Sequence, residues 1–176
     1  MAASSDYTPA TLLSLPVTDK LRDFIPKFFQ LSDNPARNKE WVDCFDPDAT
    51  VIMGKDQASG TESECTYRGR EPPWWILWGI EEALRLTRLL FQLPEIRQLR
   101  DRMWEKVASR KHTVSRFLED AHELEEEEGE RKFMLFGEVT YGLKTGETKV
   151  GSWSANARVK NTDQVRFLYY EVQISS

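Results

Sequence analysis

The chain has 176 residues, of which 40% are hydrophobic and 30% charged, so it is long enough for one domain with a sizeable core and short for two. A formal net charge of −5 and the lack of any basic run argue against electrostatic binding to nucleic acid or to an anionic membrane, because both need clustered lysines and arginines. The two cysteines, Cys44 and Cys65, have neither metal-ligand spacing nor the density of a secreted disulfide scaffold, which predicts reduced thiols, no metal site and a cytoplasmic protein.

The N-terminal part of the chain reads as helical after a short tail. Residues 1–17 lack a basic region and are broken by prolines, so they do not resemble a signal peptide. Thr18 or Asp19 can cap a helix that Pro26 should bend. The apolar positions that share one face of this helix are Leu21, Phe24, Ile25 and Phe28.

A second short helix and a strand are expected next. Asn34-Pro35 looks like an N-cap followed by a first-turn proline, and the inward positions that follow are Trp41, Val42 and Phe45. The segment "FDPDATVIMG" predicts a turn at Asp46 to Asp48 and then a brief apolar strand that ends at Gly54.

The stretch "REPPWWILWGIEEALRLTRLLFQLPEIRQLR" is more apolar than its surroundings. A membrane span needs about 20 apolar residues, but Trp74 to Ile80 supplies seven before charged residues follow, so a span is not expected. From Ile80 the apolar residues follow a helical period up to Pro94. A second helix is predicted from Pro94, and its apolar stripe consists of Ile96, Leu99, Met103 and Val107.

Downstream of this stretch the hydrophobic period changes to 2. Four segments rich in β-branched and aromatic residues are separated by turn-like sequences, which predicts an antiparallel meander. They are "KHTVSRFLED", "KFMLFGEVTYGL", "TKVGSWSANARVK" and "VRFLYYEVQIS". The link "AHELEEEEGER" between the first two is expected to be a solvated acidic loop that contains His122.

The order of these elements resembles the NTF2-like superfamily, which includes SnoaL-like proteins, ketosteroid isomerase and scytalone dehydratase. The segments "FDPDATVIMG", "EIRQLRDRMWEKVASRKHTV", "FMLFGEVTYGLKTGE" and "SWSANARV" look like the small SnoaL-like proteins of fungal natural-product pathways. The resemblance covers about Leu21 to Ile174. It implies a single α+β domain over residues 1–176, a cone in which N-terminal helices pack on a curved antiparallel sheet.

The chain departs from this pattern near residues 63–93. In the relatives the turn after the first strand leads almost directly into the third helix, as if "ASGTE" preceded "EIRQLRDRMW". The additional segment is interpreted either as a lid over the mouth of the cone or as sequence foreign to the fold, such as a gene-model artefact. In the second case Thr61 and Pro94 should lie close together, because inserting a loop between fixed ends costs little.

The resemblance also implies an acid–base centre inside the cone. His112 begins a strand directly after a helix, at a position similar to that of an active-site histidine in scytalone dehydratase, and an imidazole exchanges protons near pH 7. Glu138 and Glu171 each interrupt an apolar strand and are predicted as its catalytic partners, with Arg158 or Arg110 as their counter-ions. A purely structural role for His112 remains the alternative.

Substrate-binding residues are predicted on the polar face of the strand "GSWSANARV". Alternation places Ser154, Asn156 and Arg158 on that face. The triplet "SAN" also occurs in the corresponding strand of scytalone dehydratase, which implies that Ser154 and Asn156 hold a carbonyl or enolate oxygen. Tyr141 and Tyr169 are predicted to donate hydrogen bonds to the substrate. The alternatives are a solvated strand face and aromatic packing or dimer contacts.

The sequence therefore predicts a cofactor-independent isomerase, cyclase or dehydratase that acts on a small hydrophobic metabolite of the polycyclic or polyketide-like type, within a biosynthetic pathway. The alternative is a non-catalytic NTF2-like protein that binds a small ligand or only dimerises. A homodimer is expected through the outer face of the sheet, with Trp153 or Tyr170 in the interface. Gly137-Glu138 stands where scytalone dehydratase has a second histidine, so its dehydration route does not transfer directly.

Overall fold

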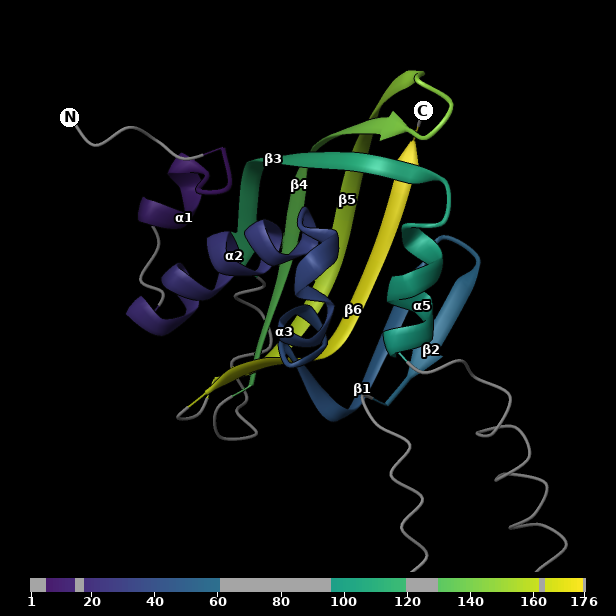
Figure 1. Ribbon diagram of the computed structural model, residues 1–176. Coiled ribbons are helices and arrows are strands. Elements are labelled where there is room, and N and C mark those ends of the chain that lie inside the picture. The colour runs from purple at the N-terminus through teal and green to yellow at the C-terminus, as the bar shows by residue number, and fades with distance from the viewer. Residues whose placement is uncertain (1–5, 15–17, 61–95, 120–129, 162–163, 176) are drawn as a thin grey trace, which may run out of the picture.

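The computed structural model describes residues 6–14, 18–60, 96–119, 130–161 and 164–175. The elements in chain order are α1 (Ala10–Ser14), α2 (Asp19–Ser32), the 3-10 helix η1 (Pro35–Arg37), α3 (Asn38–Val42), β1 (Phe45–Met53), β2 (Asp56–Ser59), α5 (Ile96–Met103), β3 (Val107–Glu119), β4 (Glu130–Leu143), β5 (Thr148–Asn161) and β6 (Val165–Ser175). The strands form one sheet in the order β2-β1-β6-β5-β4-β3, and Figure 1 shows α2 and α3 lying across its concave face.

The sheet is mixed and curved. Strands β3 to β6 form the predicted antiparallel meander, whereas β1 runs parallel to β6 and pairs with the short β2, which the sequence did not indicate. Register shifts interrupt β3 between Val114 and Arg116 and β5 between Arg158 and Val159, and such bulges bend strands. The predicted α+β cone, with helices packed on a curved sheet, is confirmed.

The helical layer begins as the sequence predicts. The Thr18 hydroxyl accepts the N–H of Leu21 at 3.3 Å and caps α2, which contains Pro26. The helix predicted from Asn34 is divided into η1 and α3, and the Asn34 side chain accepts the N–H of Ala36 at 2.9 Å. The stripe predicted from Ile96 stops one turn early, since α5 ends at Met103 and Val107 already belongs to β3.

An aromatic core fills the space between α2 and the sheet. The ring of Phe28 contacts those of Phe45, Phe167 and Tyr170 at centroid distances of 5.8, 4.7 and 5.2 Å. Trp153 and Tyr170 are only 4% and 3% exposed, so the expectation that they lie on the outer face is wrong. They lie inside because their strands turn the apolar side toward the helices, where burial is most favourable.

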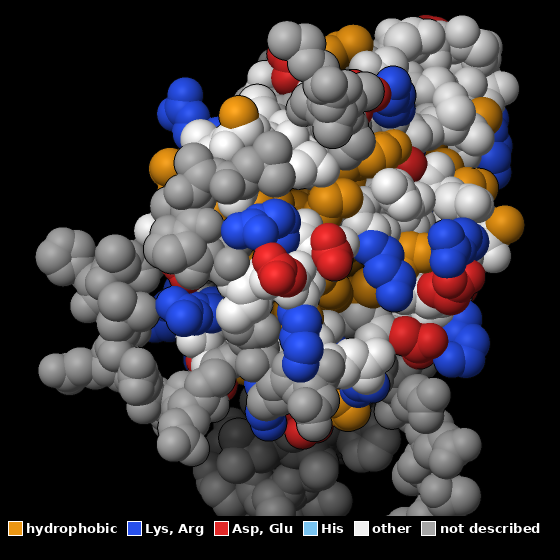
Figure 2. All heavy atoms as spheres, turned by 90° about the vertical axis from the view of Figure 1, so that its left-hand side faces the viewer, with side chains coloured by type: hydrophobic (Ala, Val, Ile, Leu, Met, Phe, Trp, Pro, Cys, Tyr) orange, Lys and Arg blue, Asp and Glu red, His pale blue; other side chains and the backbone are white. Residues whose placement is uncertain are grey.

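The described residues do not include 63–93, the positions Thr61 and Pro94 that were predicted to lie close together, or most of the acidic loop with His122. The described residues that flank the first of these segments meet: the N–H of Ile96 donates to the carbonyl of Gly60 at 3.1 Å. Within the described part of the chain, no helix is long and apolar enough to cross a membrane. Figure 2 shows acidic and basic side chains intermingled on the side of the molecule that carries α1, without a continuous field of one sign.

Candidate active site

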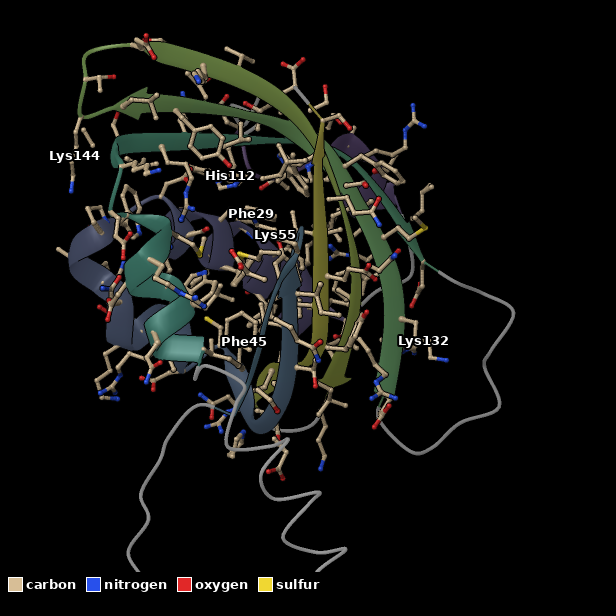
Figure 3. All side chains as sticks on the ribbon, turned by 90° about the vertical axis from the view of Figure 1, so that its right-hand side faces the viewer. Phe29, Phe45, Lys55, His112, Lys132 and Lys144 are labelled. Atoms are coloured by element: carbon tan, nitrogen blue, oxygen red, sulfur yellow. The ribbon has the colours of Figure 1, made fainter. Side chains whose placement is uncertain are left out.

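His112 lies between the sheet and the helices. It belongs to β3, where it pairs in register with Val139 of β4, and its side chain is 12% exposed. The imidazole packs against the rings of Phe29 and Trp153 at centroid distances of 5.2 and 5.8 Å. Figure 3 shows His112 and Phe29 between the sheet and the helices. We therefore expect water to have little access to this site.

Asp33 binds His112 through both carboxylate oxygens. Nδ1 of His112 lies 2.5 Å from Oδ1, and the backbone N–H of His112 donates to Oδ2 at 2.7 Å. The hydroxyl of Tyr7, from the N-terminal segment, also donates to Oδ2 at 3.2 Å. Burial and the nearby Asp33 raise the pKa of Tyr7 to about 12, so this phenol stays protonated and remains a donor at neutral pH.

The local sequence explains why Asp33 reaches the sheet. It is the C-cap of α2, and the next residue, Asn34, is extended because it precedes Pro35, which disfavours the helical conformation before it. The helix therefore ends abruptly, and the Asp33 side chain points to β3 across 79 positions of the sequence. The helix end thus supplies a carboxylate to the interior.

The hydrogen bond to Asp33 decides which ring nitrogen of His112 is free. A carboxylate can only accept, so Nδ1 carries the proton and Nε2 keeps its lone pair. Burial lowers the pKa of His112, and the hydrogen bond to Asp33 offsets this effect only in part. His112 is consequently neutral at pH 7 and can accept a proton at Nε2.

Arg100, on α5, stabilises the C-terminal end of α2. Its side chain is fully buried, and it donates to the carbonyls of Ser32, Leu31 and Asn34 at 2.8, 2.9 and 3.0 Å, and to Oδ1 of Asn38 at 3.0 Å. The carbonyls of Leu31 and Asn34 also accept backbone N–H groups, and that of Ser32 is shared with Arg110, so Arg100 adds hydrogen bonds from a buried cation to a helix end that is already paired. Burial lowers the pKa of Arg100 to about 9, which is still above neutral pH, so it remains charged.

A small pocket opens beside the histidine and is called the His112 pocket below. It has a volume of about 40 Å³. Arg110, two residues before His112 on the same face of β3, is a buried cation of this pocket; its terminal nitrogen donates to the carbonyl and the hydroxyl of Ser32. The lining residues are Phe28, Ser32, Met53, Met103, Arg110, His112, Val139, Tyr141, Trp153, Tyr170, Val172 and Ile174.

Of the predicted catalytic and substrate-binding residues, the structure places only His112 and Tyr141 at this pocket. The predicted counter-ions pair with other carboxylates: Arg110, which also lines the pocket, lies 3.6 Å from Asp33, and Arg158 lies 3.6 Å from Glu130. The other predicted catalytic and substrate-binding residues lie on the outer face of the sheet, and the prediction that they converge with His112 on one cavity is corrected. Each alternates with a residue that packs under the helices, as Asn156 does with Ala155 and Ala157. The residues on the outer face are Glu138, Ser154, Asn156, Arg158, Tyr169 and Glu171. Figure 3 shows Lys132, which pairs in register with Arg158, projecting from this outer side.

Some of the outer residues do come together. Asn156, Arg158 and Tyr169 line a hollow of about 650 Å³ that also includes the partly exposed Met134. The hydroxyl of Tyr169 donates to Glu171 at 2.9 Å. This hollow is larger than the His112 pocket, but its polar groups are solvent-accessible and lack the buried donor–acceptor pair that prepares an imidazole for proton transfer. We therefore place the candidate active site at the His112 pocket.

Asp33 was not identified from the sequence, because Asp-Asn-Pro was interpreted only as the end of one helix and the start of another. The acidic residues near the end of α3 do not reach the pocket, since Asp43 is half exposed and pairs with Lys39 at 2.9 Å. Asp46 accepts the N–H of Asp48 within β1, so the turn predicted at Asp46 to Asp48 is wrong. A helix-terminal aspartate followed by Asn-Pro, in a fold that packs that helix on a histidine-bearing strand, is the signal that could have identified Asp33.

Metal and thiol chemistry find no support among the described residues. No group of three or more His, Cys, Asp or Glu side chains is arranged there to hold a metal ion. Cys44 is buried, and burial raises the pKa of its thiol to about 12, so it is not a thiolate at neutral pH.

Comparison with known proteins supports the fold. No protein-family model and no curated protein sequence matches the chain. Solved structures do match. One is a protein assigned as a scytalone dehydratase from Novosphingobium aromaticivorans, with a TM-score of 0.62 and 11% identity over 89% of this chain and 83% of that one. Another is hexachlorocyclohexane dehydrochlorinase LinA-type3 from Novosphingobium barchaimii, with a TM-score of 0.57 and 9% identity over 89% and 85%.

A third similar structure is an NTF2-like protein of unknown function from an Exiguobacterium species, with a TM-score of 0.52 and 11% identity over 87% of this chain and 98% of that one. Identities this low establish the fold alone. The chain thus has the NTF2-like fold.

Proposed function

We propose that the protein is a cofactor-independent acid–base enzyme, an isomerase or lyase, in which His112 exchanges the proton and Asp33 fixes its tautomer. The observation that carries this proposal is the 2.5 Å contact between Nδ1 of His112 and Oδ1 of Asp33. It leaves Nε2 as the basic nitrogen, and among the described residues none donates a hydrogen bond to it. The nearby carboxylate also stabilises the imidazolium that forms when Nε2 takes a proton.

The reaction can be written with these groups alone. Nε2 of His112 removes a proton from a carbon next to a carbonyl group, and the electron pair of that C–H bond becomes the enolate. In an isomerase, the imidazolium returns the proton to another carbon. In a lyase, the enolate expels a hydroxyl group from the neighbouring carbon, and the imidazolium protonates it so that water leaves.

The names of two similar structures support the lyase alternative, because a dehydratase and a dehydrochlorinase both perform eliminations. We further propose that this chain is a SnoaL-like protein that acts on a polyketide-like metabolite in a biosynthetic pathway. The sequence segments that resemble SnoaL-like proteins support this proposal. Since the His112 pocket has only about 40 Å³, just the reacting end of a polycyclic skeleton would enter it.

A non-catalytic ligand-binding role is the second candidate, and the small volume of the pocket favours it. The arrangement around His112 favours the enzyme instead. A structural histidine would be satisfied at both ring nitrogens, whereas here a carboxylate holds Nδ1, no described residue binds Nε2, and the residue lines the pocket.

The proposal also includes a homodimer and a cytoplasmic location. The outer face of the sheet exposes Leu118 and Met134, which are 44% and 39% accessible, and such side chains favour an interface. Sedimentation should give twice the chain mass of 20.5 kDa; a monomer at micromolar concentration would contradict the dimer.

Proton exchange tests the proposal without knowledge of the product. Cyclic and aromatic ketones, with and without a carboxylate, would be incubated with the protein in deuterated water, and exchange next to the carbonyl would be followed by NMR. We expect exchange with some of them and a loss of about 10²- to 10⁴-fold in His112→Asn. His122→Asn, at the only other histidine, is the matched control and should keep the wild-type rate.

Two results would reject the proposal that the protein is an enzyme. One is exchange in His112→Asn at the wild-type rate, which would exclude His112 as the base. The other is binding of several compounds without any exchange, which would favour the ligand-binding candidate.

A further inference from the structure

The charged groups buried around the His112 pocket do not balance. Arg100 and Arg110 are 0% and 7% exposed, whereas the described carboxylates supply a single buried partner, Asp33, whose side chain is 8% exposed. His112 is neutral at pH 7. Asp101, which is exposed on α5, also attracts Arg100, but inside the cluster two guanidinium groups face one buried carboxylate. Such an excess of positive charge in an apolar interior attracts an anion more strongly than it would in water.

Arg110 is the cation with unused hydrogen-bonding capacity. Arg100 is engaged by three backbone carbonyls and an asparagine. Arg110 donates to Ser32 through one terminal nitrogen, but its Nε is buried without a hydrogen-bond partner in the described part of the chain. The nearest carboxylate oxygen, Oδ1 of Asp33, lies 3.6 Å from Nε, beyond hydrogen-bond distance. A buried unpaired donor costs about 1–3 kcal/mol and therefore needs an explanation.

The position of Arg110 suggests a ligand as that explanation. The guanidinium is stacked on the ring of Trp104 at 4.7 Å, which fixes its plane, and it belongs to the lining of the His112 pocket. Tyr141 lies in the same lining, and burial raises its pKa, so its hydroxyl stays protonated as a donor. The positive charge and the unpaired Nε–H of this guanidinium suit the oxygen of a carboxylate.

We infer that the His112 pocket binds its ligand through a carboxylate held by Arg110, with the adjacent carbon atoms directed toward His112. The substrate class would be small carboxylic acids, or larger metabolites that end in a carboxylate. A volume of about 40 Å³ admits a carboxylate and the atoms next to it, and the flexible side chains of Met53 and Met103 can make room for an apolar remainder. This inference rests on the proposed function for the location of the substrate, but it concerns binding and not turnover.

Ligand-detected NMR with two isosteric probes tests the inference. Propanoate and propanamide have the same shape and differ in charge. We expect propanoate to bind the wild-type protein saturably and at least tenfold more tightly than propanamide. Arg110→Met should weaken propanoate binding at least tenfold. Arg116→Met removes an exposed arginine of the same strand and should leave binding unchanged.

The possible outcomes distinguish binding from turnover. Equal binding of the two probes, no saturable binding of propanoate, or unchanged binding in folded Arg110→Met would overturn the inference. If Arg110→Met does not fold, Arg110→Lys is tested in its place. Lysine keeps the positive charge but lacks the planar guanidinium group, so propanoate should bind several-fold more weakly. An unchanged Kd for propanoate would reject the role of Arg110. Propanoate binding is measured on the wild-type protein and needs no turnover, so a failed exchange assay leaves the carboxylate site independently testable.

Discussion

Replacing Asp33 by asparagine should both destabilise the protein and release His112. Asp33 receives three hydrogen bonds, from two groups of His112 and from Tyr7, and its charge lies 3.6 Å from Arg110. Asparagine keeps one acceptor oxygen, so at least one buried donor loses its partner, at a cost of about 1–3 kcal/mol. Breaking a buried ion pair costs about 3–5 kcal/mol because the remaining charge is left uncompensated.

We therefore expect Asp33→Asn to lower the free energy of unfolding by about 3–5 kcal/mol, measured by denaturant unfolding with near-ultraviolet circular dichroism. The matched control is Asp43→Asn. Asp43 forms a half-exposed ion pair with Lys39, so its replacement should change stability by less than about 0.5 kcal/mol. If the two variants lose similar amounts of stability, Asp33 does not anchor His112 and the pairing of the two side chains is wrong.

Three further predictions concern the scaffold. Arg100→Met should lower the free energy of unfolding by about 3 kcal/mol, because it removes the hydrogen bonds that this buried guanidinium donates to the end of α2 and to Asn38; a loss below about 1 kcal/mol would contradict this role. Gly137→Ala should lower the free energy of unfolding by about 3 kcal/mol, because the added methyl group would lie 1.9 Å from a backbone oxygen and 2.7 Å from the ring of Trp153. The control Glu138→Ala, on the outer face of the sheet, should leave the free energy of unfolding nearly unchanged. Deleting residues 63–93 should preserve the circular dichroism spectrum and raise stability by at most roughly 2 kcal/mol, because the flanking residues are already hydrogen bonded; failure to fold would show that the segment belongs to the core.

The periodicities of the sequence were sufficient for most of the fold. The capped helix at Thr18, the antiparallel meander and the helix before His112 depend on local patterns, and these patterns are what one sequence displays directly. The short β2 could not be foreseen, since its four residues carry little periodic signal and are defined by pairing with β1.

The site was predicted less well, for two physical reasons. Alternation in β5 separated Ser154 and Asn156 from Trp153 correctly, but it does not say which face the helices cover; the apolar face is covered because its burial is more favourable. The partner of His112 was missed because Asp33 is 79 residues away in sequence, and only the packing of α2 on β3 brings the two together.

The protonation state of His112 is the property on which the proposed chemistry depends. Proton–nitrogen NMR of the histidine rings, with His122→Asn to assign the signals, reports the tautomer and the pKa of His112 in one titration. We predict a neutral ring at pH 7 with its proton on Nδ1 and a pKa below the ordinary value of 6.5, together with a free energy of unfolding that falls as the pH drops from 6.5 through that pKa, because the unfolded chain binds the proton more readily. A ring protonated on Nε2, or an imidazolium at pH 7, would contradict the proposed role of His112.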